Sequence, residues 1–127
     1  MCLILDNDSI KTIAHTDIVV YKVVTRRRTR SMKSDMFYRS PFYLFDYEKD
    51  VIYCGKLRIS VNILSGDRTV EDGFHSYEHL EDAERNTGPW GIVVKCIIPA
   101  GSEFCKGRGI DLTPQYASNK IMIKEEV

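Results

Sequence analysis

The sequence predicts an α+β domain with a mainly antiparallel, twisted sheet of about six strands and one principal helix. Two observations carry this prediction. Short runs rich in β-branched residues recur along the chain and are separated by turns that contain glycine, proline, asparagine or aspartate. Only residues 77–85 combine a preceding capping residue, Ser76, with the acidic first turns that favour a helix. Because 127 residues suffice for one hydrophobic core, we expect a single domain spanning residues 1–127.

The strongest strand of the first half is predicted at residues 18–24, after a short apolar run at residues 3–5. This segment is β-branched and almost continuously apolar, which is typical of a strand in the middle of a sheet. Lys22 interrupts it and shares a predicted face with Val20 and Val24. Its ammonium group either reaches solvent along the aliphatic stem or points into a cleft, where it is a candidate ligand contact.

A dense basic run follows this strand. It consists of Arg26, Arg27, Arg28, Arg30 and Lys33. One interpretation is a solvated hairpin loop. The other is a phosphate-binding arm formed by the four arginines, because guanidinium groups bind phosphate oxygens in pairs. The formal net charge of the chain is zero, which argues against a reader of duplex nucleic acid and favours a small phosphorylated ligand.

Residues 37–47 hold six of the twelve phenylalanine and tyrosine residues of the chain. Pro41 excludes a helix through this segment and favours an extended backbone at Ser40. We expect most of these rings in the core. Tyr38 and Tyr43 are the candidates for stacking on a planar ligand ring, a contact worth about 1–3 kcal/mol per base in proteins that bind single-stranded nucleic acids.

The remaining strands are predicted from alternation and from turn residues. Residues 51–54 form a short strand, and residues 57–63 alternate, which places Leu57, Ile59, Val61 and Ile63 on a buried face. Residues 90–98 form a second central strand, residues 103–105 a short one, and residues 120–124 a final strand whose charges suit a sheet edge.

The stretch at residues 73–77 is the predicted functional centre. Ser76 is expected to cap the helix, so a strand end would meet a helix start there, which is a common place for ligand contacts. We expect polar contacts to a ligand from five residues. These are His75, Ser76, Tyr116, Ser118 and Asn119.

Composition narrows the function classes further. No apolar run approaches 18 residues and the first residues lack the pattern of a signal peptide, so we expect a cytoplasmic protein without a membrane span. The cysteines, at positions 2, 54, 96 and 105, are too irregularly spaced for a zinc site, and we expect reduced, mostly buried thiols. Cys2 has a second interpretation, as an N-terminal nucleophile exposed by removal of Met1.

Most of the chain resembles a family of small uncharacterised proteins from gut bacteria and their phages. The resemblance implies a bacterial or phage origin. The shared motifs are Met-Cys-Leu at residues 1–3, Asp-Ile-Val-Val-Tyr-Lys-Val at 17–23, Ser-Pro-Phe at 40–42, Gly-Phe-His-Ser at 73–76, Ile-Pro-Ala-Gly-Ser at 98–102 and Tyr-Ala-Ser-Asn at 116–119.

Two of these motifs also resemble, more distantly, the ADP-ribosyltransferase-like fold. Residues 73–76 are similar to its middle motif and residues 97–102 to its late motif. Tyr21-Lys22 stands where that fold has an arginine, and residues 115–118 stand where its catalytic glutamate is expected. A missing carboxylate removes the main electrostatic element of transfer chemistry. The resemblance therefore implies a pocket for a nicotinamide- or ADP-ribose-like nucleotide without transferase activity.

We therefore expect a non-catalytic binding protein for a small phosphorylated, nucleotide-like ligand, with no metal or cofactor. In a phage, such a protein could sequester a nucleotide signal used in host defence. Two alternatives stay open. One is a protein-interaction module or inhibitor that exposes the aromatic segment 37–47. The other is a divergent NAD-processing enzyme that uses Cys2, or His75 as a base beside Ser76. Paired edge strands would also permit a homodimer.

Overall fold

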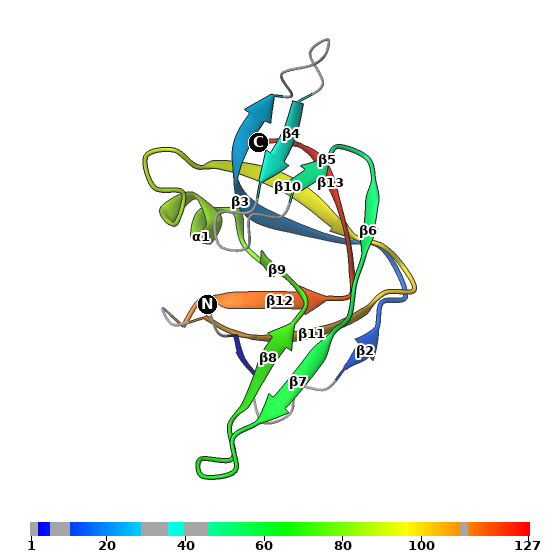
Figure 1. Cartoon of the computed structure of the whole chain (residues 1–127), viewed down its shortest axis with the longest axis vertical. Helices are drawn as coiled ribbons and strands as arrows, with labels where there is room; N and C mark the ends of the chain where they lie inside the picture. Colours follow the sequence, from blue (N-terminus) through cyan, green and yellow to red (C-terminus); the bar gives the residue numbers. More distant parts are fainter. Residues whose placement is uncertain (1–2, 6–10, 29–35, 40–45, 110–111) are drawn as a thin grey trace.

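The computed structural model describes residues 3–5, 11–28, 36–39, 46–109 and 112–127, with residues 26–28, 36–39 and 46 described by their backbone. Within these ranges lie thirteen strands and one short helix, α1 (Leu80–Arg85) (Figure 1). The strands are β1 (Ile4–Leu5), β2 (Thr12–Ile13), β3 (Ile18–Arg28), β4 (Met36–Arg39), β5 (Asp46–Glu48), β6 (Ile52–Cys54), β7 (Arg58–Val61), β8 (Arg68–Asp72), β9 (Phe74–Tyr77), β10 (Ile92–Ile98), β11 (Glu103–Arg108), β12 (Pro114–Ser118) and β13 (Lys120–Glu126).

Eleven of these strands form the main sheet, and β4 and β5 extend it from the far end of β3. The order is β6-β13-β10-β3-β9-β12-β11-β1-β8-β7, with β2 paired to β11, and every pair of named strands is antiparallel. The mainly antiparallel sheet is confirmed, but it is larger than the six strands predicted. Several strands have only two to four residues, too few to produce an alternating pattern in the sequence.

Two buried clusters form the core. The first packs around Val20, Val24, Val94 and Cys96, on β3 and β10, which confirms these segments as central strands. The second cluster gathers Leu3, Leu5, Leu57, Val70, Cys105 and Ala117. Strand β12 contributes to both, because alternate residues of a strand point to opposite faces: Tyr116 joins the first cluster and Ala117 the second.

The β7–β8 hairpin corrects the prediction for residues 57–63. Leu57 is buried as expected, but β7 ends at Val61 and the Ile63 side chain is 97% exposed. Asn62 starts a turn: its side-chain oxygen accepts a 2.9 Å hydrogen bond from the Leu64 amide, and its carbonyl accepts one of 2.8 Å from Gly66. Asparagine favours such turns, and here it outweighs the apolar alternation.

The predicted helix start is also wrong. Ser76 lies within β9, and α1 begins at Leu80 after His79, whose side chain makes no capping hydrogen bond. Pairing of β9 with β12 supplies the backbone partners of this segment, so tertiary pairing overrides the local capping signal. Strand β13, predicted at an edge, lies between β10 and β6.

Candidate functional site

Lys22 is a buried cation in the first core cluster. Its side chain is 7% exposed and lies on the same face of β3 as Val20 and Val24. Its Nζ donates a hydrogen bond to the backbone carbonyl of His75 and lies 5.6 Å from the centre of the Tyr47 ring. Among the residues that the structure describes, no carboxylate pairs with this ammonium group. Burial lowers the pKa of Lys22, because the charged form loses its hydration.

Ser76 lies beside this ammonium group. Strands β3 and β9 meet antiparallel at Tyr21 and Tyr77, so Lys22 and Ser76 share the opposite face of the two strands. The peptide bond that joins His75 to Ser76 carries the carbonyl that Lys22 contacts. Within the described part of the chain, the Ser76 hydroxyl is a buried side-chain group that has no hydrogen-bond partner. The Lys22 ammonium group and the Ser76 hydroxyl, which would both gain from a further hydrogen-bond partner, therefore lie on neighbouring strands of the same face.

The same face continues across two more strands. Tyr116 on β12 is opposite Ser76, and Lys106 on β11 is opposite Tyr116. Lys22, Ser76, Tyr116 and Lys106 thus form a line across four neighbouring strands, which we call the transverse row. Adjacent strands lie about 4.8 Å apart, so Lys22 and Tyr116 are separated by roughly 10 Å at the backbone.

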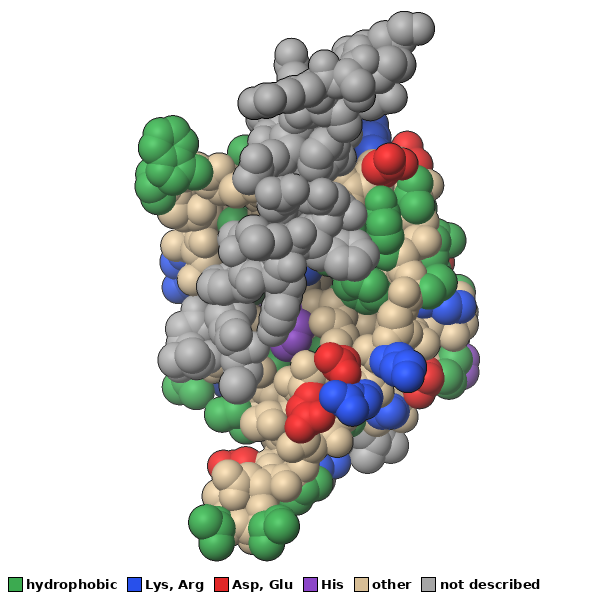
Figure 2. All heavy atoms as spheres, viewed as in Figure 1, with side chains coloured by type: hydrophobic (Ala, Val, Ile, Leu, Met, Phe, Trp, Pro, Cys, Tyr) green, Lys and Arg blue, Asp and Glu red, His purple; other side chains and the backbone are tan. Residues whose placement is uncertain are grey.

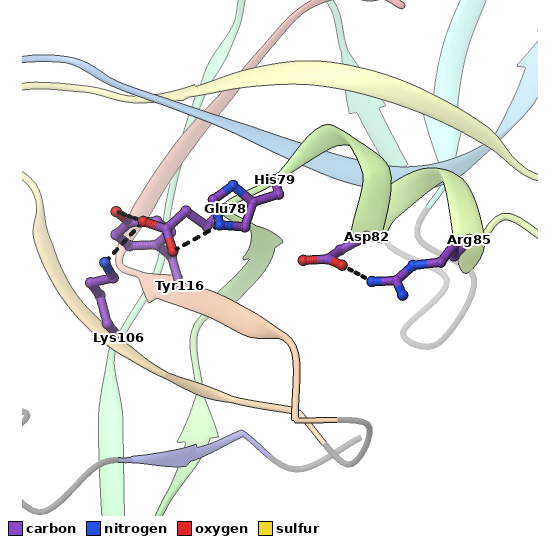
Figure 3. Close-up of polar contacts among 6 residues, drawn as sticks. All are labelled: Glu78, His79, Asp82, Arg85, Lys106 and Tyr116. Atoms are coloured by element: carbon purple, nitrogen blue, oxygen red, sulfur yellow. Dashed lines mark hydrogen bonds and ion pairs between the residues drawn. The ribbon is translucent and has the colours of Figure 1, made fainter.

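At the Lys106 end of the transverse row, the Glu78 carboxylate contacts three side chains (Figure 3). Its Oε1 accepts a 3.0 Å hydrogen bond from Lys106 Nζ and lies 3.5 Å from the Tyr116 hydroxyl, and its Oε2 is 3.7 Å from His79 Nε2. The hydrogen bond with Glu78 raises the pKa of Lys106. The Asp82–Arg85 ion pair of α1 lies apart from this group (Figure 3). Within the described part of the chain, the Lys106 end of the row therefore has a carboxylate partner and the Lys22 end does not.

His75 points away from the transverse row. It is opposite Ala117 in the pairing of β9 with β12, so it faces the second cluster while Ser76 faces the first. Burial, followed by the charge of Lys22, lowers the pKa of His75 to about 4, so the imidazole is neutral at pH 7. The alternative in which His75 acts as a base beside Ser76 requires a turn between the two residues, and β9 is instead a continuous strand there.

Two other predicted contacts are engaged within the fold. The Ser118 hydroxyl donates a 2.9 Å hydrogen bond to the carbonyl of Lys120, and the Asn119 side chain accepts one of 2.9 Å from the Glu103 amide. Both residues hold the connection between β12 and β13. Of the five polar residues predicted around the helix start, Ser76 and Tyr116 lie in the transverse row.

The backbone of three of the four predicted arginines lies at the far end of β3 from the transverse row. Arg26, Arg27 and Arg28 end β3, where their backbone pairs with β4 and Arg26 is opposite Tyr38. Arg26 is four residues beyond Lys22, or roughly 13 Å along the strand. Arg30 and Tyr43 lie outside the described residues, as does Cys2.

The cysteines and Tyr47 add to the surroundings of Lys22. The Cys96 thiol is buried in the same cluster, and burial raises its pKa to about 12, so it stays a neutral thiol. Cys105 is also buried as predicted, whereas Cys54 is exposed. Tyr47 is buried in the first cluster and packs edge-on against Tyr53, with ring centres 5.2 Å apart. This ring confirms the core interpretation for its part of the aromatic segment.

Sequence reasoning missed Tyr47, Glu78 and Lys106 as parts of the site. Glu78 could have been found from the sequence. It is two residues after Ser76, and residues i and i+2 of a strand point to the same face. Lys106 had no such signal. Among the described residues, no group of three or more histidine, cysteine or acidic side chains is arranged to hold a metal ion.

We compared the chain with protein-family models, with curated proteins and with solved structures. None of them matches. Separately, no helix in the described ranges has the length and apolar character needed to cross a membrane.

Proposed function

We propose that the protein is a non-catalytic binding protein for a small phosphorylated, nucleotide-like ligand, held at the Lys22 end of the transverse row. One observation carries the proposal: among the residues that the structure describes, the buried Lys22 ammonium group contacts only uncharged groups, and the buried Ser76 hydroxyl next to it has no hydrogen-bond partner. A phosphate would supply negative charge to Lys22 and an acceptor to Ser76, and hydrogen bonds between charged groups are the strong ones. Burial without such a partner is costly for both groups.

The length of the row favours a nucleotide over a lone phosphate. Roughly 10 Å separates the backbones of Lys22 and Tyr116, and a ligand that reaches from one to the other needs more than a single anionic group. The Tyr47 ring lies near Lys22 at one end of this distance and the Tyr116 ring at the other, and both rings are buried in the first cluster. In this proposal the arginines of the β3–β4 hairpin are not needed for binding.

The ADP-ribosyltransferase-like fold is the finer form of the proposal. Lys22 and Ser76 stand at the positions that resemble the arginine and the middle motif of that fold, and they are adjacent here. Residues 115–118, which stand where its glutamate is expected, lie on the next strand, β12. This arrangement supports a nicotinamide- or ADP-ribose-like ligand. For a phage protein, capture of such a ligand would remove a nucleotide signal from host defence.

Thermal-shift and calorimetric titrations with ADP-ribose, its cyclic forms, and cyclic di- and trinucleotides test the proposal. We expect at least one of them to stabilise the protein, since a ligand at 100 times its Kd adds about 2.7 kcal/mol to the free energy of unfolding. Lys22→Met should abolish the effect. Lys124→Met is the matched control, because Lys124 is an exposed lysine that pairs with Asp50 at the surface. No stabilisation by any of these ligands, or equal stabilisation of the Lys22→Met protein, would contradict the proposal.

A second measurement separates binding from catalysis. The protein is incubated with NAD and with the best ligand, and the products are separated by chromatography. The proposal expects both compounds to be recovered intact. Turnover that survives in Lys22→Met would instead point to a divergent enzyme with its chemistry elsewhere in the chain.

A further inference from the structure

The tip of the β7–β8 hairpin presents two apolar side chains to solvent. Ile63 and Leu64 are 97% and 98% exposed, and Val61 beside them is also exposed. The hairpin projects from the body at the end of the long axis opposite the β3–β4 hairpin (Figure 1). Hydrophobic side chains mark its tip, and charged ones gather nearer its base (Figure 2). Single exposed aliphatic residues are ordinary, but an adjacent pair on a projecting tip indicates a contact surface.

Hydrogen bonds hold this tip in one shape. The Asn62 amide donates to the Asp67 carbonyl at 2.8 Å, and the Asn62 side chain accepts from the amides of Leu64 and Ser65 at 2.9 and 3.3 Å. The Ser65 hydroxyl accepts from the Asp67 amide at 3.3 Å. None of these bonds uses the side chains of Ile63 or Leu64. Both side chains are therefore presented by a preorganised turn, which lowers the entropic cost of binding.

We propose that this tip docks into another protein, in an apolar socket with a cationic rim that receives Ile63 and Leu64. The proposal stands independently of the ligand site. The turn at residues 62–67 contains one acid, Asp67, and no lysine or arginine. Residues 58–72 contain two arginines and three acidic residues, which gives the hairpin a formal charge of −1. These residues are Arg58, Arg68, Asp67, Glu71 and Asp72.

This charge selects a protein over the other surfaces that would accept an apolar tip. An anionic membrane attracts apolar segments that carry a net positive charge. Arg68 lies opposite Val61 in this hairpin, but it stands next to Asp67, and the hairpin as a whole has a net negative charge. A second copy of the chain is a poor partner because two projecting tips would bring only four aliphatic side chains together. Stable interfaces use about 20–30 residues on each side. A concave partner surrounds the tip and can also reach the outer edge of β7, which no other described strand pairs.

The test begins with photo-crosslinking in the organism that makes the protein. A benzophenone amino acid is placed at Val61, at the base of the tip, and the crosslinked protein is identified by mass spectrometry and then purified. We expect the purified partner to bind the wild-type chain and to bind Ile63→Ser/Leu64→Ser at least about tenfold more weakly, as for hot-spot residues. The double variant should keep the wild-type Tm, since both side chains are exposed. Trp90→Ser is the matched control, because Trp90 is 85% exposed in the connection between α1 and β10 and should leave binding unchanged.

Three results would overturn the proposal. The first is the absence of a crosslinked protein, or binding of the partner that the double variant does not weaken. The second is binding to vesicles of phosphatidylcholine and phosphatidylserine that the double variant loses, which would make a membrane the occupant. The third is a dimer of the wild-type chain in sedimentation equilibrium that the double variant dissociates, which would make a second copy the occupant.

Discussion

Replacing Lys22 by methionine tests how the buried ammonium group affects stability. The substitution removes a hydrogen bond from a charged donor, worth about 1.5–3 kcal/mol, and a cation–π contact with Tyr47 of up to about 2 kcal/mol. It also removes a desolvation penalty of several kcal/mol for one buried ion. These contributions nearly cancel, and methionine fills a similar apolar space. We expect Lys22→Met to be as stable as the wild-type protein or more stable, by up to about 2 kcal/mol at pH 7.

The pH dependence of this difference gives the sharper test. Because the folded-state pKa of Lys22 is lowered, the unfolded chain binds more protons between that value and the ordinary pKa of 10.5. The penalty from Lys22 is therefore complete below the folded pKa and disappears as the pH rises toward 10.5. Urea denaturation of both proteins at several pH values from 7 to 10 measures the gap, and all other titrating groups cancel in the comparison. A gap that stays constant with pH, or a Lys22→Met protein destabilised by more than about 3 kcal/mol, would refute this reasoning.

Three other substitutions have expected outcomes. The pKa of His75 is lowered to about 4, so below pH 6.5 the unfolded chain takes up a proton that the folded chain does not. Acidification from pH 6.5 to 4 should therefore lower the free energy of unfolding by at most about 3 kcal/mol through this residue. His75→Gln should reduce that loss of stability in urea titrations. Ser76→Ala removes a buried hydroxyl that has no partner among the described residues, and it should raise the free energy of unfolding by about 1 kcal/mol while weakening ligand binding; a lower Tm would contradict this. Gly107→Ala places a methyl group 2.4 Å from the Ile4 carbonyl oxygen and should cost about 1–3 kcal/mol by thermal denaturation, whereas an unchanged Tm would show that β1 moves freely.

The candidate site shows where sequence reasoning succeeded and where it failed. Lys22 was identified because a lysine in an almost continuously apolar strand is unusual, and the structure places its ammonium group inside. Ser76 was identified for the wrong reason, as a helix cap, since its local pattern does fit a cap. The basic run at residues 26–30 has the stronger chemical signature, yet the described part of its backbone, residues 26–28 of β3, leads away from Lys22. Local composition shows which residues are unusual and does not show which of them meet.

By itself, the sequence determined the character of the central strands and one cation among them. Residues 18–24 and 92–98 are β-branched and apolar over a length that leaves few alternatives to a buried strand, so their placement follows from local preference and burial. Only the tertiary structure decided that Lys22, Ser76, Tyr116 and Lys106 lie in one row. Lys22 and Ser76 are far from each other and from the β11–β12 pair in the chain. The strand pairs that align them form through backbone hydrogen bonds, which any residue except proline can make. Register between distant strands therefore leaves no local trace in one sequence, whereas the burial of a strand does.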